Sequence, residues 1–358
     1  MDWSAFWSLN QRCMSLKEGI QRVPVLIDIP GDWVCLKMQL DNAKYYSDFE
    51  YQYDARCRCN ELLSRELGIQ LTPQVDFGVV QDASIYGGKV HYDSLATPTL
   101  TPVLEDPSEI PALIDRMDKT DPLDAGLVPQ YLQWREAFRK RTGISLPYGK
   151  SQKGAATMLG QLCSITNFLT WILTDPEEIR LLIECWQRTS IRYLTALRKE
   201  TGTDACQDAF SIQSDVTGLM SGALYRESLM QAELALYNAF ATDAGAIRYY
   251  HADSHMLQHL DALREIGVNQ VNIDPYIEPA AIMEKIPGVI IHGQIPPTSV
   301  LLYGTAEEIQ RCVKRDIEQA GPTRQLILTT AGSINPGTPM ENLYAMCEAV
   351  ERWGYIYE

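Results

Sequence analysis

The sequence predicts an α/β protein: a (β/α)₈ TIM barrel with a helical extension at its N-terminus. From about residue 140 onward, short apolar runs alternate with amphipathic helical stretches, the pattern of a mostly parallel sheet. Eight candidate strands can be counted, the number that closes such a barrel. A length of 358 residues suits one barrel with an extension. We therefore expect residues 1–358 to form a single domain.

Each candidate strand is a short segment rich in β-branched or aromatic side chains. The eight segments are residues 23–29, 73–78, 144–149, 205–211, 246–251, 270–274, 288–292 and 325–330. Residues 85–104 contain Gly87 and Gly88 followed by alternating Thr, Val and Leu, which predicts a small antiparallel excursion with turns.

Four predicted helices begin at side chains that can accept hydrogen bonds from the first free backbone N–H groups. These capping residues are Asp106, Asp175, Thr305 and Thr338, and proline follows all but Thr305. After Thr305, the apolar residues Ile309, Val313 and Ile317 recur every four positions, with charged residues on the other faces. This spacing predicts a helix on the outside of the barrel.

The composition excludes several classes of protein. With 46 acidic and 31 basic residues the net charge is −15, which disfavours binding to nucleic acid or to an anionic membrane surface. The nine cysteines are odd in number and scattered, as is typical of reduced thiols in a cytosol. The first residues do not resemble a signal peptide, and no apolar run reaches membrane-spanning length. We expect a cytoplasmic protein.

In (β/α)₈ barrels the substrate binds at the carboxyl ends of the strands, so polar side chains there are candidate site residues. They are Asp28, Trp33, Asp76, Tyr148, Asp215, His251, Asp253, Asp274, His292 and Gln294. Asp274 precedes Pro275, which favours a role in a turn. Asp76 lies between Val75 and Phe77, where a buried charge is costly unless it faces a pocket or a partner.

His251 and Asp253 form the strongest pair among these candidates, because both belong to one strand end and the loop that follows it. Together with Asp215 or Glu227 from the preceding βα unit, they would supply three nitrogen and oxygen ligands and leave one metal position open for catalysis. The alternative is an Asp–His hydrogen bond that orders the loop. The residue types alone favour neither interpretation.

The sequence does not support the other catalytic or cofactor-binding motifs that its residues suggest. Gly87-Gly88 lacks the strand–GxGxxG–helix context of a dinucleotide site, and no Walker loop or nucleophile elbow occurs. His251, His255 and His259 have helical zinc-motif spacing, but His251 should end a strand and therefore cannot share a helical face with the other two. No nucleotide cofactor is expected.

Three stretches of the C-terminal third resemble the uroporphyrinogen decarboxylase superfamily. They are residues 263–274 (LREIGVNQVNID), 293–309 (GQIPP followed by LLYGTAEEI) and 331–343 (AGSINPGTPMENL). The resemblance extends over roughly residues 140–358. It implies a (β/α)₈ barrel and one of two chemistries: cofactor-free decarboxylation of a heme precursor, or methyl transfer between a small substrate and a corrinoid protein.

The resemblance also separates these chemistries. The decarboxylases carry an arginine-rich stretch after the first strand that holds the substrate's carboxylates, whereas this chain has Asp28 and Asp32 and no arginine there, although Asp76 matches the family's essential aspartate. The thiol-methylating branch has a counterpart of His251. At the positions of that branch's two zinc-binding cysteines, however, this chain has Asp253 and Gly332. A tetrapyrrole decarboxylase, or a non-catalytic protein that binds a tetrapyrrole or small aromatic, remains the alternative.

The branch that this chain resembles best demethylates aryl methyl ethers in anaerobes and uses carboxylates with a histidine. The resemblance then implies transfer of a methyl group from a small donor to the Co(I) corrinoid, a cobalamin, of a separate corrinoid protein, because no Asp-x-His-x-x-Gly motif occurs here. The implied catalytic residues are His251, Asp253, Asp215 and Asp76, and a zinc ion would be bound by His251, Asp215 and Glu227. The implied substrate-binding residues are Tyr148, Tyr86, Trp33, Gln294 and His292.

Overall fold

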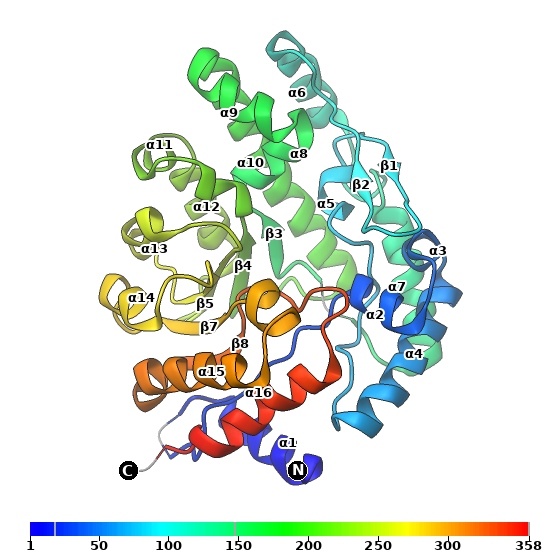
Figure 1. The fold of residues 1–358 in the computed structure, drawn as a ribbon. Coiled ribbons are helices and arrows are strands. Elements are labelled where there is room, and N and C mark those ends of the chain that lie inside the picture. The colour runs from blue at the N-terminus through cyan, green and yellow to red at the C-terminus, as the bar shows by residue number, and fades with distance from the viewer. Residues whose placement is uncertain (18, 147, 357–358) are drawn as a thin grey trace.

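The computed structural model describes residues 1–17, 19–146 and 148–356, and its centre is a parallel sheet of six strands in the order β3-β4-β5-β6-β7-β8 (Figure 1). The strands are β3 (Ser151–Lys153), β4 (Ala209–Gln213), β5 (Ile247–Ala252), β6 (Gln270–Ile273), β7 (Ile290–Ile295) and β8 (Leu326–Thr330). Each strand pairs with the next in the chain, and helices connect them, which is the arrangement of a (β/α)₈ barrel. The predicted fold class is confirmed.

Five predicted strands, 205–211, 246–251, 270–274, 288–292 and 325–330, are found with boundaries shifted by a few residues. Of the predicted strand 144–149, residue 147 lies outside the described residues, and the others form no strand. The third strand instead begins at Ser151.

The predicted first strand lies in its expected place but is not a regular strand. Val25 forms an isolated parallel bridge to Leu328, so residues 23–29 run beside β8. On the other side, the backbone N–H of Val25 donates to Asn10 Oδ1 (2.7 Å) and the Asn10 amide donates to the Val25 carbonyl (2.9 Å). A side-chain amide thus takes the place of a neighbouring strand, and the ladder stops there.

The predicted second strand, 73–78, is wrong for the same physical reason. The Gln52 amide donates to the carbonyl of Asp76 (2.7 Å) and accepts from its N–H (2.9 Å), so these backbone groups do not pair with a strand. Pro73 also lacks the donor that a ladder requires. Between β8 and β3 the described residues therefore form two irregular segments in place of the two predicted strands.

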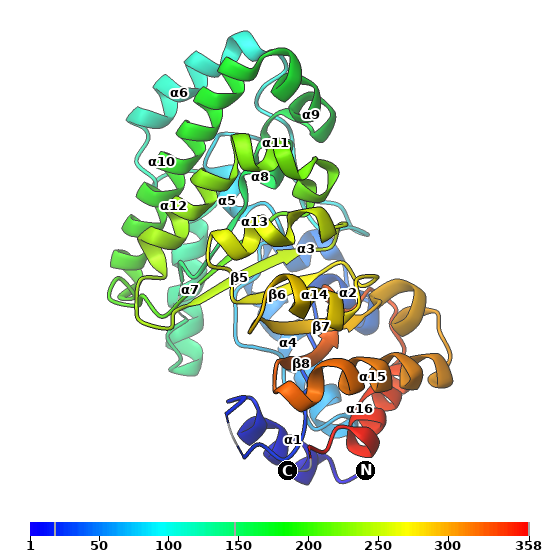
Figure 2. The same cartoon turned by 90° about the vertical axis from the view of Figure 1, so that its left-hand side faces the viewer.

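Helices cover the outside of the sheet. Figure 1 shows α11 to α16 along one side and α2, α3, α4 and α7 along the other, and Figure 2 shows α6, α9 and α10 extending beyond the barrel. The helices are α1 (Trp3–Cys13), α2 (Gly31–Met38), α3 (Asn42–Ser47), α4 (Phe49–Glu66), α5 (Gln81–Ser84), α6 (Ile110–Lys119), α7 (Val128–Thr142), α8 (Ala155–Cys163), α9 (Ile165–Thr174), α10 (Pro176–Thr201), α11 (Gly222–Ser228), α12 (Met230–Phe240), α13 (Leu260–Glu265), α14 (Pro279–Lys285), α15 (Ala306–Ala320) and α16 (Met340–Trp353). Shorter helical turns are η1 (Pro107–Glu109), η2 (Asp215–Leu219), η3 (Leu257–His259), η4 (Pro297–Leu302) and η5 (Gly321–Thr323). The predicted helical N-terminal extension is present as α1 to α4.

Local sequence signals explain several elements. Thr305 and Glu308 form a capping box at the start of α15, and Ile309, Val313 and Ile317 face the core as predicted. The antiparallel excursion is confirmed as β1 (Val90–His91) paired with β2 (Thr99–Leu100).

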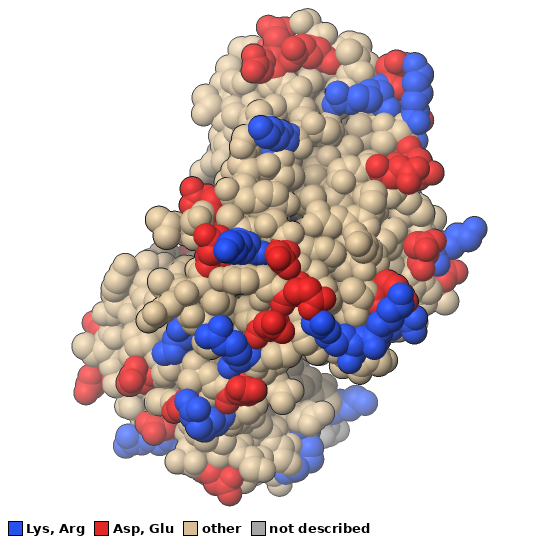
Figure 3. Space-filling view, turned by 90° about the vertical axis from the view of Figure 1, so that its right-hand side faces the viewer, with Lys and Arg blue, Asp and Glu red and all other residues tan. Residues whose placement is uncertain are grey.

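Within the part of the chain that the structure describes, no single helix has both the length and the apolar character needed to cross a membrane. The pair α8 and α9 meets both conditions together, but the chain bends by 106° between them. On the face that Figure 3 shows, acidic and basic side chains are interspersed, with broad uncharged areas between them.

Candidate active site

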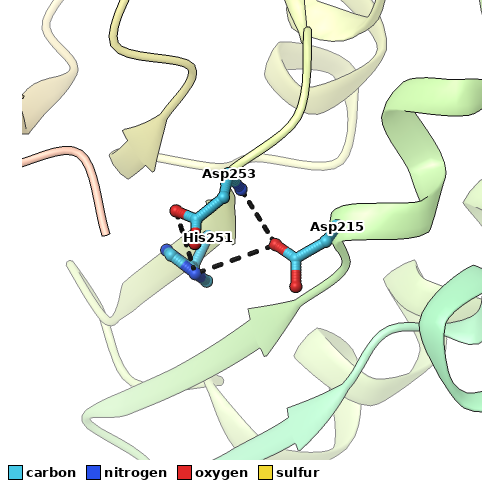
Figure 4. Close-up of side chains that lie close together, drawn as sticks. All are labelled: Asp215, His251 and Asp253. Carbon is cyan, nitrogen blue, oxygen red and sulfur yellow. Dashed lines mark hydrogen bonds and ion pairs between the residues drawn. The ribbon is translucent and has the colours of Figure 1, made fainter. Parts of the chain in front are cut away.

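Asp215, His251 and Asp253 converge at the carboxyl ends of β4 and β5 (Figure 4). Parallel pairing places Gln213 opposite His251, and Asp215 and Asp253 each follow by two residues. His251 Nε2 lies 3.8 Å from Asp215 Oδ1 and 3.6 Å from Asp253 Oδ1. The Asp253 N–H donates to Asp215 Oδ1 (2.8 Å), which ties the two loops together. The predicted convergence is therefore observed.

Asn272 on β6 determines the tautomer of the His251 ring. The Asn272 amide nitrogen donates to the carbonyls of His292 and Thr330, and its Oδ1 accepts from the N–H of Gly332 (2.7 Å). That oxygen also lies 2.9 Å from His251 Nδ1, which must therefore be the donor. In the neutral ring, Nε2 then carries the lone pair, and it faces the two carboxylates.

The three ligand atoms fit a divalent cation. One imidazole lone pair and two carboxylate oxygens lie within 4.8 Å of one another, and they supply acceptors with no donor among them. Such a group is stabilised by a metal ion or a proton placed between its members. The pKa of Asp253 is raised, mainly by burial. The neighbouring His251 lowers this pKa, and the neighbouring Asp215 raises it further. An imidazole with carboxylate oxygens is a donor set that zinc accepts.

A cavity of about 460 Å³ opens beside these three residues. Asp28 and His292 also line it, and none of its described lining residues is Lys or Arg. Burial raises the pKa of Asp28, and burial lowers the pKa of His292 to about 4, so His292 is neutral near pH 7. The described lining of the cavity therefore contains acids, a neutral His292 and no Lys or Arg, which makes it a poor site for a polyanion.

A second cavity of about 390 Å³ lies next to the first, and Gln213 lines both. It contains two predicted residues, Asp76 and Tyr148. Asp76 accepts a hydrogen bond from the N–H of Gly78 (2.8 Å), and burial raises its pKa. The Tyr148 hydroxyl contacts Gln81 Nε2 (2.9 Å) and lies on this cavity rather than beside His251.

Four predicted site residues lie elsewhere. Trp33 is 1% exposed and donates through its indole N–H to the Thr338 carbonyl, and Tyr86 is fully buried in the core. Gln294 is also fully buried, and its amide holds the loop after β6. The helical turn η2 carries the chain away from the site, so Glu227 is an exposed residue of α11 and does not join the three ligand residues.

Two residues of the site were not predicted. Asn272 was overlooked because its partners lie 20 to 60 residues away in the chain, although its place near the end of β6, two residues before Asp274, was a usable signal. Gly332 allows Asp253 to approach, because a Cβ at this position would lie 2.6 Å from Asp253 Oδ1, and its φ of +91° also favours glycine. Asp274, expected in a turn, accepts from the Tyr276 N–H (3.0 Å) and contacts His255.

Comparison with known proteins places this geometry in context. The profile of the family described as Uroporphyrinogen decarboxylase (URO-D) matches residues 71–353. The chain is 24% identical over 281 residues to a methylated-thiol–coenzyme M methyltransferase of Methanosarcina mazei, covering 77% of this chain and 71% of that protein. It is 20% identical over 297 residues to the methylcobamide:CoM methyltransferase MtbA of Methanosarcina acetivorans, covering 79% and 80% of the two chains.

A decarboxylase matches over a shorter part. The uroporphyrinogen decarboxylase of Anaeromyxobacter dehalogenans is 31% identical over 97 residues, 27% of this chain and 28% of that protein. Among solved structures, a methyltransferase from Methanosarcina mazei superposes with a TM-score of 0.71 at 19% identity, covering 96% of this chain and 98% of that chain. This similarity supports the barrel fold.

Proposed function

This chain belongs to the uroporphyrinogen decarboxylase family, and from that membership we propose that it is a corrinoid-dependent methyltransferase. The relatives that it matches over most of their length are named as methyltransferases, two of them acting on methylcobamide or a methylated thiol. The observation that carries the proposal is the site itself: His251 Nε2 faces the carboxylates of Asp215 and Asp253 in a cavity whose described lining residues include no Lys or Arg.

The same cavity disfavours decarboxylation of a tetrapyrrole. A substrate with many carboxylates is held by arginines or lysines through charge-assisted hydrogen bonds. The described lining of the first cavity instead includes Asp28, Asp215 and Asp253. No Lys or Arg among the described lining residues offsets the negative charge of such a substrate.

We propose that the methyl donor is a small aryl methyl ether. Positions 253 and 332 carry Asp and Gly rather than cysteine, so the ligand set contains oxygen and nitrogen and no thiolate. In the reaction the donor's methyl–oxygen bond breaks, the methyl group passes to the cobalt of a corrinoid on a partner protein, and the donor oxygen keeps the bonding electrons. That oxygen becomes an anion and requires a stabilising group.

His251, Asp215 and Asp253 would hold a zinc ion, which when bound acts as a Lewis acid toward the leaving oxygen. Asn272 keeps His251 Nδ1 protonated and so directs the Nε2 lone pair into the site. The hydrogen bond from the Asp253 N–H to Asp215 holds the two acidic loops at a fixed separation.

An anaerobic visible-absorption assay tests the proposal. The purified protein is mixed with Co(I) cobalamin and, one at a time, with phenolic methyl ethers, methylamines and methylated thiols. We expect conversion to methylcobalamin with a methyl ether, and loss of that conversion in His251→Ala. Absence of conversion with every donor would contradict methyl transfer, and release of CO₂ from a tetrapyrrole would support the decarboxylase instead. Tight retention of a tetrapyrrole without turnover would support a binding protein.

A further inference from the structure

We propose that Lys153 binds an anionic group, such as a carboxylate, on the methyl donor, at the opposite end from the methyl group. This inference rests on the proposed function and adds the class of donor: an aromatic acid that carries a methyl ether. It assigns a role to Lys153 and to the second cavity, neither of which the methyl-transfer site uses.

The register of the sheet places Lys153 and His251 in one layer of the barrel interior. Lys153 pairs with Gln213 on β4, and Gln213 pairs with His251 on β5. Side chains that are paired across parallel strands lie on the same face of the sheet, and neighbouring strands are about 4.8 Å apart. The Cα atoms of Lys153 and His251 are therefore about 10 Å apart. Gln213 lies between them and lines both cavities.

The Lys153 ammonium is held in position at the wall of the second cavity. It donates to Asp82, whose carboxylate also accepts from the N–H groups of Ala83 (3.0 Å) and Lys153 (3.2 Å). Both side chains of the ion pair keep 13% of their surface exposed. An ammonium has three N–H donors, and among the described residues Asp82 is its one hydrogen-bonding partner. Two donors are thus left for a bound anion.

The distribution of charge gives an anionic donor one orientation. The described lining of the first cavity holds the acids Asp28, Asp215 and Asp253 and no Lys or Arg, whereas that of the second holds two acids, Asp76 and Asp82, and two cations, Lys150 and Lys153. Burial raises the pKa of Asp76 in the second cavity and those of Asp28 and Asp253 in the first, so the two cations, and not the protonation of the acids, distinguish the second cavity. A methoxy-substituted aromatic acid therefore enters with its carboxylate toward Lys153 and its methyl group toward His251.

The chain offers a matched control in Lys150. It also lines the second cavity, but its ammonium donates to Asp208 (3.0 Å), and its side chain is 40% exposed. Lys150 precedes β3, whereas Lys153 ends it, so Lys150 lies at the opposite end of the strand from the site. Lys150→Gln changes the net charge as much as Lys153→Gln does.

Titration calorimetry tests the inference without requiring turnover. The ligands are para-methoxybenzoate and its uncharged analogue methoxybenzene. We expect the wild type to bind the acid more tightly than methoxybenzene. Lys153→Gln should weaken binding of the acid by at least about tenfold and leave binding of methoxybenzene unchanged, whereas Lys150→Gln, at the far end of the same cavity, should weaken binding of the acid clearly less. Equal binding of the acid by wild type and Lys153→Gln, or no preference for the acid in the wild type, would overturn the inference.

Lys153→Gln leaves the Asp82 carboxylate without its cation. A double variant, Lys153→Gln with Asp82→Asn, therefore provides a second test in which no carboxylate is left unpaired. It should fold and should also lose the preference for the acid; retention of that preference would overturn the inference. If the wild type binds the acid through Lys153 but transfers no methyl group, the proposed function fails while the anion site stands. If methyl transfer occurs from neutral ethers only, the anion site fails while the function stands.

Discussion

Asn272 is the residue on which the chemistry of His251 depends. Four hydrogen bonds fix its amide, and one of them leaves the Nε2 lone pair of His251 directed at two carboxylates. Such partners behind a metal-binding histidine set its tautomer and the position of its ring. Asn272 would not contact the metal itself, but it therefore decides whether His251 can bind one.

Replacing Asn272 by Leu should lower zinc affinity about 10- to 100-fold, because His251 loses the acceptor that fixes its tautomer. Competition with a chelating dye measures the affinity. Asn269→Leu is the matched control, because Asn269, the residue before β6, also forms hydrogen bonds with backbone groups, those of Ala246 and Arg248. Both variants should lose stability, whereas an equal loss of zinc affinity in the control would show that the effect is structural only.

Individual side chains of the site could be predicted where their place in the chain was sufficient. Asp215, His251 and Asp253 follow strand ends, and strand ends meet at one rim of a barrel. Trp33 and Tyr86 were expected on a cavity wall because of their amphipathic rings, but both are buried in the core. The orientation of an aromatic ring depends on contacts with residues that are distant in the chain, and a single sequence does not show which residues these are.

At the scale of elements, the loop after β8 shapes the site through glycine. Gly332 and Gly337 both have positive φ, of +91° and +85°, but only a Cβ at 332 would approach the Asp253 carboxylate, at 2.6 Å. At 337 the nearest atoms lie 3.6 Å away.

Gly332→Ala and Gly337→Ala should both cost about 1–3 kcal/mol of backbone strain, whereas only Gly332→Ala should displace Asp253 and weaken zinc binding. Chemical denaturation measures the first effect and chelator competition the second. Equal zinc affinity in the two variants would show that Asp253 is not a ligand.

A buried acid links α12 to the start of α8. Glu233 accepts from the Ala155 N–H (3.1 Å) and the Tyr225 hydroxyl (2.8 Å), and burial raises its pKa from 4.5 to about 7. The folded state therefore holds a proton on Glu233 that the unfolded state releases near its ordinary pKa. This contribution to stability is complete below pH 4.5 and is lost as pH rises through about 7.

The free energy of unfolding of the wild type should consequently fall by about 3 kcal/mol relative to Glu233→Gln as pH rises from about 5 to about 8. Urea unfolding at several pH values measures the difference between the two proteins, which removes the contribution of groups that both share. A difference that does not change with pH would mean that Glu233 is ionised throughout.

Most barrel strands could be predicted because β4 to β8 are apolar runs bounded by turns. The irregular form of the first two predicted strands, 23–29 and 73–78, could not be predicted. The side-chain amides that take the place of their neighbouring strands come from Asn10 on α1 and Gln52 on α4. When a side chain from another element interrupts strand pairing, the residues of the strand itself do not indicate it.

At the scale of the whole molecule, the site opens at a rim that a corrinoid protein must reach if the chain has the proposed function. Val79, which lines the first cavity, is 54% exposed, and Leu219, at the end of the turn that begins with Asp215, is 60% exposed. A protein that docks on this rim would cover both side chains.

Leu219→Glu should reduce methyl transfer to a protein-bound corrinoid and leave transfer to free cobalamin unchanged. Ile144→Glu, at a 45% exposed residue that precedes β3 at the other end of the barrel, is the control and should affect neither reaction. Loss of both reactions in Leu219→Glu would place Leu219 in the substrate site rather than at a docking surface.

The most direct test of the account is zinc analysis of protein purified without chelator, combined with X-ray absorption at the zinc edge. We predict about one zinc ion per chain, bound by nitrogen and oxygen only, and its loss in His251→Ala. Absence of metal from both proteins, or sulfur in the zinc coordination shell, would contradict it.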